Sequence, residues 1–580
     1  MTTLLRNLPI LASVAARHLD RGPVAVGSAL VRGLPSRVRS RLDPALERMA
    51  PTLAALGDAA SGRGSEAVVA LESIARDAAV GPALRAVEAL SVLHRTSEAR
   101  VALDDLRGRT DHPDRLALVE ARLLAEEGHL TRALDVLGHA PRSRARTRLE
   151  ASIEGELSAL DAPSRLAAGP AAPRRRTDHA PARALHLVTT ALPEAQTGYT
   201  IRTQGIARGL VESGVTVDVV PRLGFPVDTG VVTAARTIAL DGVSYRRLLP
   251  VRALPLGAGA RLDETVRLVT GLVAELQPDV LHAHSMHHNA QVALAVGRAT
   301  GLPVVYEVRG FLEETWRTRG GDPASDRYVR SRAAETACMA AADAVVTLSR
   351  SMADEIVARG IAAERVHVVP NAVPDDHVGA PTTRADARAS LGIPADAIVL
   401  GFSGTLNEYE GLDVLIDALS LGDDPRVRLL VVGSGSALGA MRERASGLGD
   451  RVRFTGRVPH ADVRDHLAAM DLYCVPRLST PVTRLVPPLK PLEALATGVP
   501  VLASDLPPLV ELASEGPFVH LAPAGDADAW WRAIAGLTAD RDALQAAGAA
   551  GRDWACSNRT WGRLAGDYRV IYDEAARGRR

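Results

Sequence analysis

The sequence predicts an α/β protein in which two Rossmann-like domains face each other across a cleft, preceded by an all-α region. Two observations lead to this prediction. From residue 184 onward, short apolar segments alternate with amphipathic helical segments, in two series with a break near residues 374–388. Before residue 160, apolar residues recur with helical spacing, and segments typical of strands are almost absent. Strand–helix alternation builds a parallel sheet covered on both faces, so each series predicts one α/β domain.

The composition limits the class of protein. With 580 residues the chain is too long for one hydrophobic core, and about three domains are expected. Its 68 basic and 68 acidic residues give a formal net charge of zero. A protein that binds nucleic acid through its overall field is positive, so nucleic acid is not an expected partner.

The cysteines and the apolar segments bear on the compartment. Cys338, Cys474 and Cys556 lie far apart, without metal or redox spacing, which is typical of a reducing cytosol. The sequence lacks an apolar run of about 18 residues, so no transmembrane helix is expected. The start of the chain is too interrupted for a convincing signal peptide. We expect a cytoplasmic protein, with attachment to the inner face of the membrane as an open alternative.

Residues 1–160 are predicted to form the helical N-terminal region. The stretch 115–137 predicts two helices around Gly128, and its small and apolar positions resemble a tetratricopeptide unit. Residues 89–106 echo the pattern roughly thirty residues earlier. Two imperfect units are fewer than a stable solenoid normally needs. A tetratricopeptide-like array and an irregular helical domain therefore both remain open.

Two basic segments are notable here, one within this region and one directly after it. Residues 30–42 suit either an amphipathic surface for anionic lipid or an ordinary solvated helix face. Residues 161–183 are rich in Ala, Pro and Arg without a period, which predicts a flexible linker. Contact with a membrane or a protein through the helical region is therefore an additional expected interaction.

The two alternating series define the rest of the chain. The first domain is predicted at residues 184–374 and the second at 375–560, followed by a C-terminal helix or tail at 561–580. Ligands bind at the carboxyl ends of parallel strands and between facing domains, so the chemistry is expected there. The predicted strands read "ALHLVTT", "VTVDVV", "VLHAHS", "PVVYEV", "AVVTLS" and "RVHVVP", then "AIVLGFSG", "VRLLVVGSG", "RVRFTG", "DLYCVP" and "VPVLAS".

A charge pair interrupts an otherwise apolar segment near the end of the second series. Residues 489–496 predict a short helix and residues 499–504 a buried strand. Lys490 and Glu493 are three residues apart and share one face of the first turn. A helix N-terminus attracts phosphate, and a lysine there adds a full positive charge. The alternative is an ordinary surface ion pair, which contributes tenths of a kcal/mol, roughly.

The ordered set of segments resembles a known family. "TGYTIRTQGIARGLVESGVTVDVV", "PDVLHAHS", "ADAVVTLSRSMADEI", "VHVVPNAV", "GTLNEYEGLDVLIDAL", "LLVVGSGS", "VRFTGRVP" and "LKPLEALATGVPVLASD" together look like a retaining glycosyltransferase of family 4. The resemblance covers residues 184–560 and implies the GT-B fold. It also implies transfer of a sugar from a nucleotide-diphosphate donor to an acceptor such as a glycan, a lipid or a small molecule. The alternative is a catalytically degenerate module that acts as a scaffold through its helical region.

The resemblance implies a donor site on the second domain. Lys490 is expected to contact the diphosphate and to stabilise the leaving group, and Glu493 is expected to bind the ribose. Around them, the residues expected to bind the donor are Gly404, Thr405, Arg484, Gly456, Arg457 and Val458. The glycine turn at Gly433 and Gly435 lacks the acidic residue of a dinucleotide site, so a structural turn is predicted.

The donor motifs depart from the family pattern at three positions. Relatives usually have arginine and lysine, both reaching the phosphates, where this chain has Thr405 and Glu410. Leu485 replaces the first glutamate of the family's pair. Arg484 and Lys490 are close enough in sequence to supply replacement charge.

The first domain is expected to hold the acceptor. A guanidinium at Arg309 would stabilise the leaving diphosphate, which makes it the second expected catalytic residue, or hold an acidic acceptor. The alternatives are an ion pair with Glu307 and, for His284, plain packing. Asn371 is expected to shape the hinge. The residues expected on the acceptor side are Gly198, Tyr199, Arg202, His284, Glu307 and Arg309.

Neither a metal nor another cofactor is expected. The segment "HAHSMHH" contains His282, His284, His287 and His288. Alternate histidines of the strand are expected to point to opposite faces, and no third-ligand cluster follows. The paired aspartates at 375–376 and 423–424 are predicted in loops away from the cleft.

Overall fold

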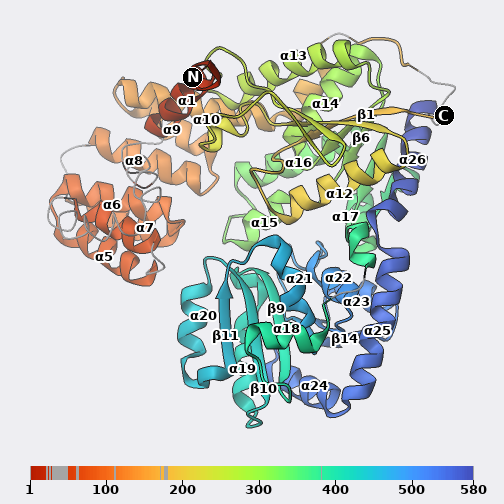
Figure 1. Ribbon diagram of the computed structural model, residues 1–580. Coiled ribbons are helices and arrows are strands. Elements are labelled where there is room, and N and C mark those ends of the chain that lie inside the picture. The colour runs from red at the N-terminus through yellow and green to blue at the C-terminus, as the bar shows by residue number, and fades with distance from the viewer. Residues whose placement is uncertain are drawn as a thin grey trace.

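The structure, a computed structural model, describes residues 2–20, 24, 28, 50–60, 64–109, 113–169, 171–175, 180–379 and 382–578. It has three parts: two α/β domains stacked one above the other, and a helical region beside the first of them (Figure 1). The predicted fold class is confirmed, because both sheets are built mainly of parallel strands. None of the described helices is long and apolar enough to cross a membrane.

The first α/β domain is built on an eight-stranded sheet in the order β3-β4-β2-β1-β5-β6-β7-β8. Its pairs are parallel, except for the antiparallel hairpin of β3 and β4. The central strands β5, β6 and β7 are buried along their whole length, which explains why their sequences are mainly apolar. The strands are β1 (Arg183–Val188), β2 (Thr216–Pro221), β3 (Thr237–Leu240), β4 (Val243–Arg246), β5 (Val280–His284), β6 (Val304–Glu307), β7 (Ala344–Thr347) and β8 (Val366–Val368).

Helices cover both faces of this sheet (Figure 1). They are α12 (Gly198–Glu212), α13 (Ala258–Leu276), α14 (His287–Thr300), α15 (Leu312–Thr318), α16 (Asp326–Ala341) and α17 (Arg350–Ala358).

The edge hairpin of β3 and β4 was not predicted from the sequence. Residues of β3 are alternately exposed and half-buried, so this strand lacks the continuous apolar run used to identify the others. Its turn, Asp241–Gly242, has φ of 51° and 78°, and an Asp-Gly turn with positive φ is the strongest local sign of a hairpin.

The second α/β domain has a six-stranded parallel sheet in the order β11-β10-β9-β12-β13-β14. The edge strand β14 is half-exposed and was not predicted. The strands are β9 (Ile398–Thr405), β10 (Val427–Ser434), β11 (Val452–Gly456), β12 (Leu472–Val475), β13 (Val501–Ser504) and β14 (Val519–Ala522). The helices are α18 (Arg384–Leu391), α19 (Leu412–Leu421), α20 (Leu438–Arg444), α21 (His460–Ala468), α22 (Lys490–Thr497), α23 (Pro507–Ala513), α24 (Ala527–Ala539) and α25 (Arg541–Asn558).

The C-terminal helix α26 (Trp561–Arg577) returns to the first domain, along the side of the molecule (Figure 1). Trp561, Tyr568 and Tyr572 are buried with β1, β2 and α12 in one apolar cluster. The predicted C-terminal segment is therefore a helix that belongs to the first domain's core.

The N-terminal region is helical, as predicted. The helix pair around Gly128 is confirmed, and Gly128 has φ of 88°. His94, 34 residues earlier (128 − 94), also has positive φ, and the pairs Leu90/Leu124, Ala99/Ala133 and Leu103/Leu137 share the same spacing and are all buried. A tetratricopeptide repeat has about this length, so two repeating units are present. The helices are α1 (Thr2–Asp20), α4 (Pro51–Ala60), α5 (Gly64–Asp77), α6 (Val80–Val92), α7 (Thr96–Arg107), α8 (Pro113–Glu126), α9 (Leu130–His139), α10 (Arg144–Leu160) and α11 (Ala162–Ala167).

The prediction of a flexible linker at residues 161–183 is wrong for its first half. Helix α11 lies there, with Ala162 fully buried, and it packs on α14 and α16. The amide nitrogens of Ala172 and Arg175 donate to carbonyl groups at the end of α14, 2.8 Å away in both cases. Composition alone missed these contacts because they depend on the neighbouring domain. The basic segment 30–42 lies outside the described residues.

Candidate active site

Helix α22 starts at the edge where the strands of the second domain end. Its N-cap is Leu489, Pro491 lies in its first turn, and Gly498 ends it with φ of 88°. Proline is accepted in a first turn because its missing N–H has no partner there, and glycine takes a positive φ without strain. Leu492 is buried in the core, which fixes the helix against the sheet. The helix begins one residue later than predicted.

Lys490 and Glu493 form a salt bridge on the first turn of α22. The lysine Nζ lies 2.9 and 3.2 Å from the two carboxylate oxygens. The side chain of Glu493 is 7% exposed and that of Lys490 is 29% exposed. The ion pair that was the alternative is therefore observed. It is not a fully exposed pair, because the carboxylate is buried and only the ammonium is partly solvated. A phosphate that approaches this helix N-terminus meets Lys490 first.

Lys490 is also the sole lysine of the chain. The 68 basic residues are 67 arginines and one lysine. An ammonium is a compact point charge on a flexible stem, whereas a guanidinium is a planar fork, so the two are not equivalent at a binding site. Because all the other residues in this count are arginines, the lysine makes position 490 chemically distinct. This signal is present in the sequence but was not used in the prediction.

Gly404 and Thr405 end β9 beside the glycine turn that ends β10. A Cβ built on Gly404 meets no atom within 4 Å, so space is open beside its backbone. A Cβ on Gly433 or Gly435 would overlap the backbone of Gly404 or Leu406. The two glycines of β10 therefore allow two loops to approach closely, as the structural-turn interpretation predicts.

Glu410, in place of the usual lysine, faces an arginine that the sequence analysis missed. Arg477 donates to both carboxylate oxygens of Glu410 at 2.9 and 3.0 Å, and to the carbonyl oxygen of Val486 at 3.0 Å. Arg477 is thus the arginine that lies against Glu410. Arg484 is exposed, and its Nη1 lies 3.4 Å from Ser479 Oγ. The position of Arg477, directly after β12, was the available signal.

The loop at residues 476–489 belongs to the second domain and contacts the first. Ser349 Oγ donates to the carbonyl oxygen of Leu485 at 3.3 Å, and Asn371 Nδ2 donates to that of Pro487 at 3.4 Å. Leu485, which replaces the family's first glutamate, also packs against the apolar core of the first domain. The replaced position therefore contributes an apolar contact between the two domains.

Gly456 is the last residue of β11, and Arg457 and Val458 follow it. Gly456 has φ of 73°, and a Cβ there meets no atom within 4 Å. Arg457 is exposed, and Val458 packs against the core. The turn thus has an open backbone at the sheet edge, as a nucleotide-edging loop requires.

Glu307 lies at the centre of a buried network in the first domain. It accepts hydrogen bonds from Arg202 Nε at 2.8 Å, Arg309 Nε at 2.7 Å and the hydroxyl of Tyr568 at 2.8 Å. Burial acts to raise the pKa of Glu307, but Arg309 and Arg202 outweigh it and hold that pKa well below its usual range. The carboxylate is ionised inside the core.

The N–H groups of both arginines in this network donate hydrogen bonds to protein groups. Arg202 also donates to the carbonyl oxygens of Val369 and Pro370, both at 2.8 Å, next to the hinge residue Asn371. Arg309 donates to the carbonyl oxygen of Tyr199 at 2.9 Å, to Thr203 Oγ1 at 2.8 Å, and to His284. The ion-pair alternative for Arg309 and Glu307 is therefore observed. The guanidinium of Arg309 is buried and paired, and is not directed into an open cleft.

The prediction that alternate histidines of the strand point to opposite faces is wrong. His282 and His284 are two residues apart and so share one face of β5, not opposite faces. His186 stands opposite His282 on β1, and the ligand atoms of these three histidines lie within 4.8 Å of one another. The structure thus contains a cluster with metal-binding composition where none was expected.

The surroundings of the three histidines favour hydrogen bonding over metal binding. His186 Nε2 lies 2.9 Å from the Tyr572 hydroxyl, and His186 Nδ1 lies 3.1 Å from His284 Nε2. Burial lowers the pKa of His186 and His284 well below the usual range, so both rings are neutral. Arg309 contacts His284, and a fixed positive charge opposes a second cation.

Gly198 and Tyr199 begin α12 at the sheet edge. Thr197 caps the helix with its side chain, and a Cβ on Gly198 meets no atom within 4 Å. The Tyr199 hydroxyl accepts a hydrogen bond from the amide of Thr189 at 2.9 Å, and Arg309 lies over its ring. The backbone at Gly198 is open, whereas Tyr199 is engaged in the network.

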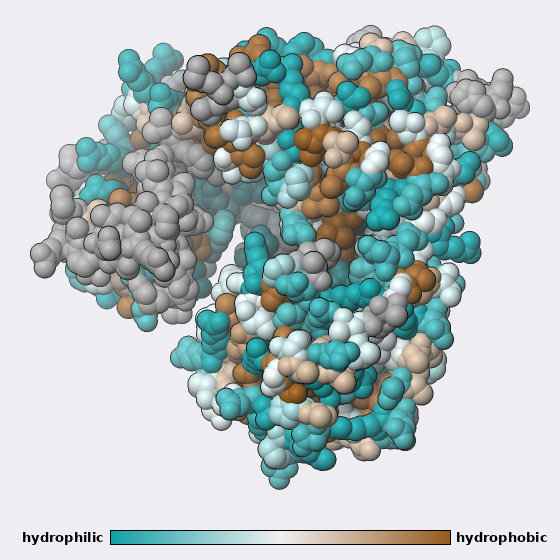
Figure 2. Space-filling model, in the orientation of Figure 1, coloured by the Kyte–Doolittle hydropathy of each residue, from teal (hydrophilic) through white to brown (hydrophobic). Residues whose placement is uncertain are grey.

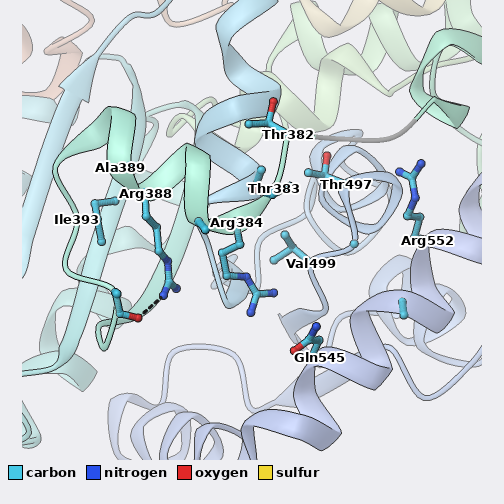
Figure 3. A pocket seen from close by; sticks show the side chains of 15 residues that line it. Thr382, Thr383, Arg384, Arg388, Ala389, Ile393, Thr497, Val499, Gln545 and Arg552 are labelled. Atoms are coloured by element: carbon cyan, nitrogen blue, oxygen red, sulfur yellow. Dashed lines mark hydrogen bonds between the residues drawn. The ribbon is translucent and has the colours of Figure 1, made fainter.

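One cavity of the second domain lies away from these residues. It measures about 710 Å³ and is lined by α18, α25 and the C-terminal end of α22 (Figure 3). Its arginines have protein partners: Arg384 and Arg388 bind Asp471, and Arg552 binds the carbonyl oxygen of Ala496. The cavity is at the opposite end of α22 from Lys490 and takes no part in the candidate site.

Comparison with known proteins identifies the family. Residues 397–540 match the family model described as glycosyl transferases group 1, and residues 197–372 match the glycosyl transferase 4-like domain. D-inositol 3-phosphate glycosyltransferase 1 of Catenulispora acidiphila is 31% identical, over 51% of this chain and 72% of its own. The chain is a group 1 glycosyltransferase. The corresponding enzyme of Stackebrandtia nassauensis is 29% identical over 52% of this chain and 69% of its own, so this glycosyltransferase shares its two α/β domains with enzymes of glycosyl transfer.

Solved structures agree on the fold of this glycosyltransferase. A sucrose-phosphate synthase from Thermosynechococcus elongatus has a TM-score of 0.56 at 22% identity, over 67% of this chain and 98% of its own. HepE of Anabaena in complex with UDP has a TM-score of 0.52 at 19% identity, over the same shares. These likenesses show the GT-B fold for about two thirds of the chain.

Proposed function

We propose that this glycosyltransferase takes its sugar from a nucleotide-diphosphate donor held at the start of α22. The observation that carries the proposal is the chain's sole lysine, Lys490, above a buried carboxylate on the first helical turn. A helix N-terminus attracts phosphate, and the ammonium adds a full charge. Glu493 accepts hydrogen bonds and suits the ribose hydroxyls. The complexes of HepE with UDP and with UDP-glucose support this class of donor.

Lys490 also has the main catalytic role in this proposal. As the bond to the sugar breaks, negative charge grows on the departing diphosphate, and a positive group already in place lowers the barrier. To do this, Lys490 turns from Glu493 toward the phosphate. The open backbone at Gly404 and Thr405 gives the sugar and phosphate room, and residues 456–458 border the base. The loop at 476–489 excludes water from the closed cleft. Retention of configuration follows from the family resemblance.

The buried residues of the first domain have a positioning role. Arg309 fixes Glu307 and the backbone of Tyr199, and Arg202 fixes the hinge, so the acceptor-side edge near Gly198 and His284 is held in one geometry. We propose that the reaction needs no metal, because Arg309 adjoins the three histidines. No nucleic acid takes part.

The acceptor carries a hydroxyl group that attacks the sugar, as part of a glycan, a lipid or a small molecule. The names of the relatives mention D-inositol 3-phosphate, and the name of a Mycobacterium leprae relative mentions phosphatidyl-myo-inositol. A soluble and a lipid-linked acceptor are both compatible with work in the cytoplasm or at the inner face of the membrane.

A thermal-shift series tests the donor proposal. UDP-, GDP- and ADP-sugars are added to the full chain and to Lys490→Met, Glu493→Gln and, as a control, Arg532→Met. Arg532 is an exposed residue of α24, so its loss changes the net charge equally. We expect one donor class to raise the melting temperature of the wild type and the control. At equal ligand, Lys490→Met should lose most of the shift, since removing a charge-assisted bond weakens binding by roughly tenfold or more. Equal shifts in all four proteins would refute the assigned site.

A further inference from the structure

A second cavity lies between the helical N-terminal region and the first α/β domain. It measures about 300 Å³ and lies between α10 and the start of α13 on one side and the first turns of α14, α15 and α16 on the other. Figure 2 shows a gap between the helical region and the second domain, whereas the lining residues place this cavity against the first domain. Its lining includes the mainly apolar set Ala159, Leu160, Met286, His288, Leu312 and Trp316, together with polar and charged residues such as Glu156, Glu313, Arg327, Tyr328 and Ser331.

The cavity lies at the edge of the sheet where ligands bind in this type of fold. Met286 and His288 follow the carboxyl end of β5, and Leu312 and Trp316 follow that of β6. The last residue of α15, Thr318, accepts a hydrogen bond from the backbone of Val482 in the interdomain loop at 3.4 Å. The helix that forms one wall of the cavity thus also borders the cleft.

The wall that comes from the helical region is firmly attached. Gln291 Nε2 donates to the carbonyl oxygen of Ala159 at 3.0 Å, in the buried contact between α14 and α10. Arg327 donates to the carboxylate of Glu156 at 2.7 and 3.2 Å. These bonds join α10 to two helices of the acceptor-side domain, so the cavity exists only because the N-terminal region is docked there.

The charges around the cavity are balanced. Glu156 is paired with Arg327, and the buried carboxylate of Glu313 is paired with Arg359 at 2.7 Å. Burial lowers the pKa of His288 to about 4, so this imidazole is neutral near pH 7. An anionic ligand would find these arginines already occupied by carboxylates.

Polar atoms without partners lie beside the apolar walls. Two residues that line the cavity carry such atoms: His288 Nδ1 and Glu313 Oε2 are buried and have no hydrogen-bond partner within the described chain. Buried polar groups are normally satisfied, so such atoms around one cavity indicate that something polar belongs in it. Trp316 and Met286 offer apolar surface next to them. The matching ligand has both an apolar face and hydroxyl groups.

We propose that this cavity is a subsite for a neutral sugar ring of the acceptor, built jointly by α10 and the acceptor-side domain. A sugar ring places its C–H face on an aromatic side chain and its hydroxyls on polar atoms. An aliphatic chain would cover Trp316 but leave His288 unpaired, and a phosphate would lie near the carboxylate of Glu313. The proposal rests on the proposed function, since it names part of that enzyme's acceptor.

The test is ligand binding by the full chain without any nucleotide, measured by saturation-transfer NMR. The probes are methyl α-glucoside, methyl α-mannoside, methyl β-galactoside, 1-octanol and inorganic phosphate. Two variants fill the cavity, Ser331→Leu and Leu312→Trp, and their controls are Ser331→Ala and Leu312→Met. Leu312 is 41% exposed, so the variants at Leu312 should fold even if those at Ser331 disturb folding.

We expect at least one methyl glycoside to bind, and both filling variants to weaken it by roughly tenfold or more while the controls do not. Glycoside binding that survives filling, or binding of octanol or phosphate alone, would overturn the proposal. The absence of any glycoside binding would also overturn it. Donor binding is measured separately in the thermal-shift series, so a failure of the donor site is distinguishable from a failure of this subsite.

Discussion

At the residue scale, Glu307 organises the buried centre of the first domain. Its carboxylate balances Arg202 and Arg309, and these two arginines in turn hold the hinge carbonyls and the backbone of Tyr199. The sequence identified these residues at the strand ends, but their partners come from β6, α12 and α26, more than 100 residues apart in places. Such pairing is set by packing, which is why the ion-pair alternative had to stay open until the structure was known.

Replacing Glu307 by glutamine leaves two buried guanidinium groups without their counter-ion. Breaking a buried pair in this way costs about 3–5 kcal/mol of unfolding free energy. The exposed pair of Arg208 and Glu212 provides the control, since Glu212→Gln removes at most about 1 kcal/mol. Urea unfolding at pH 7 measures both. Because the folded pKa of Glu307 is depressed, its contribution is present above the unfolded pKa and is lost as the pH falls through the lower folded pKa. Equal effects of the two variants would contradict this role.

At the element scale, the buried parallel strands were predictable and the edges were not. Mainly apolar segments identified β5, β6 and β7, because both faces of these strands are covered. Strands β3 and β14 are half-exposed and carry no such run. Helix α22 was found from its prolines and Gly498. Arg477 was missed because its partner, Glu410, follows a different strand.

Substitution of Gly411 by alanine tests the close approach of the loops after β9 and β12. It has φ of 70°, and a Cβ there would overlap the carbonyl oxygen of Pro476. Gly392 has φ of 63° and nothing within 4 Å of the same position. Gly392→Ala should therefore cost about 1 kcal/mol from backbone strain, and Gly411→Ala should cost a further 1–3 kcal/mol, roughly, from overlap. Chemical denaturation compares them, and the steric argument fails if Gly411→Ala is the milder change.

At the scale of the whole molecule, three connections hold the parts together. The loop at 476–489 bridges the cleft, α26 returns to the first domain, and α10 docks the helical region on the acceptor side. The sequence predicted the two α/β domains and the helical region. It missed how these parts contact one another, because the contacts are single residues such as Leu485 and Glu156 and have no periodic signal.

The most direct measurement of the central claim uses the chain's sole lysine. Protein grown with ¹⁵N,¹³C-lysine gives the side-chain signal of Lys490 alone, and the acceptor need not be known. We predict that a nucleotide-diphosphate sugar shifts this signal in a saturable way and that Glu493→Gln weakens the response. Nucleoside diphosphate should also be released slowly in the same tube, because water takes the sugar in place of the acceptor. A lysine signal unchanged by every donor that binds the protein would contradict the account. A shift without any release would favour the scaffold alternative over transfer.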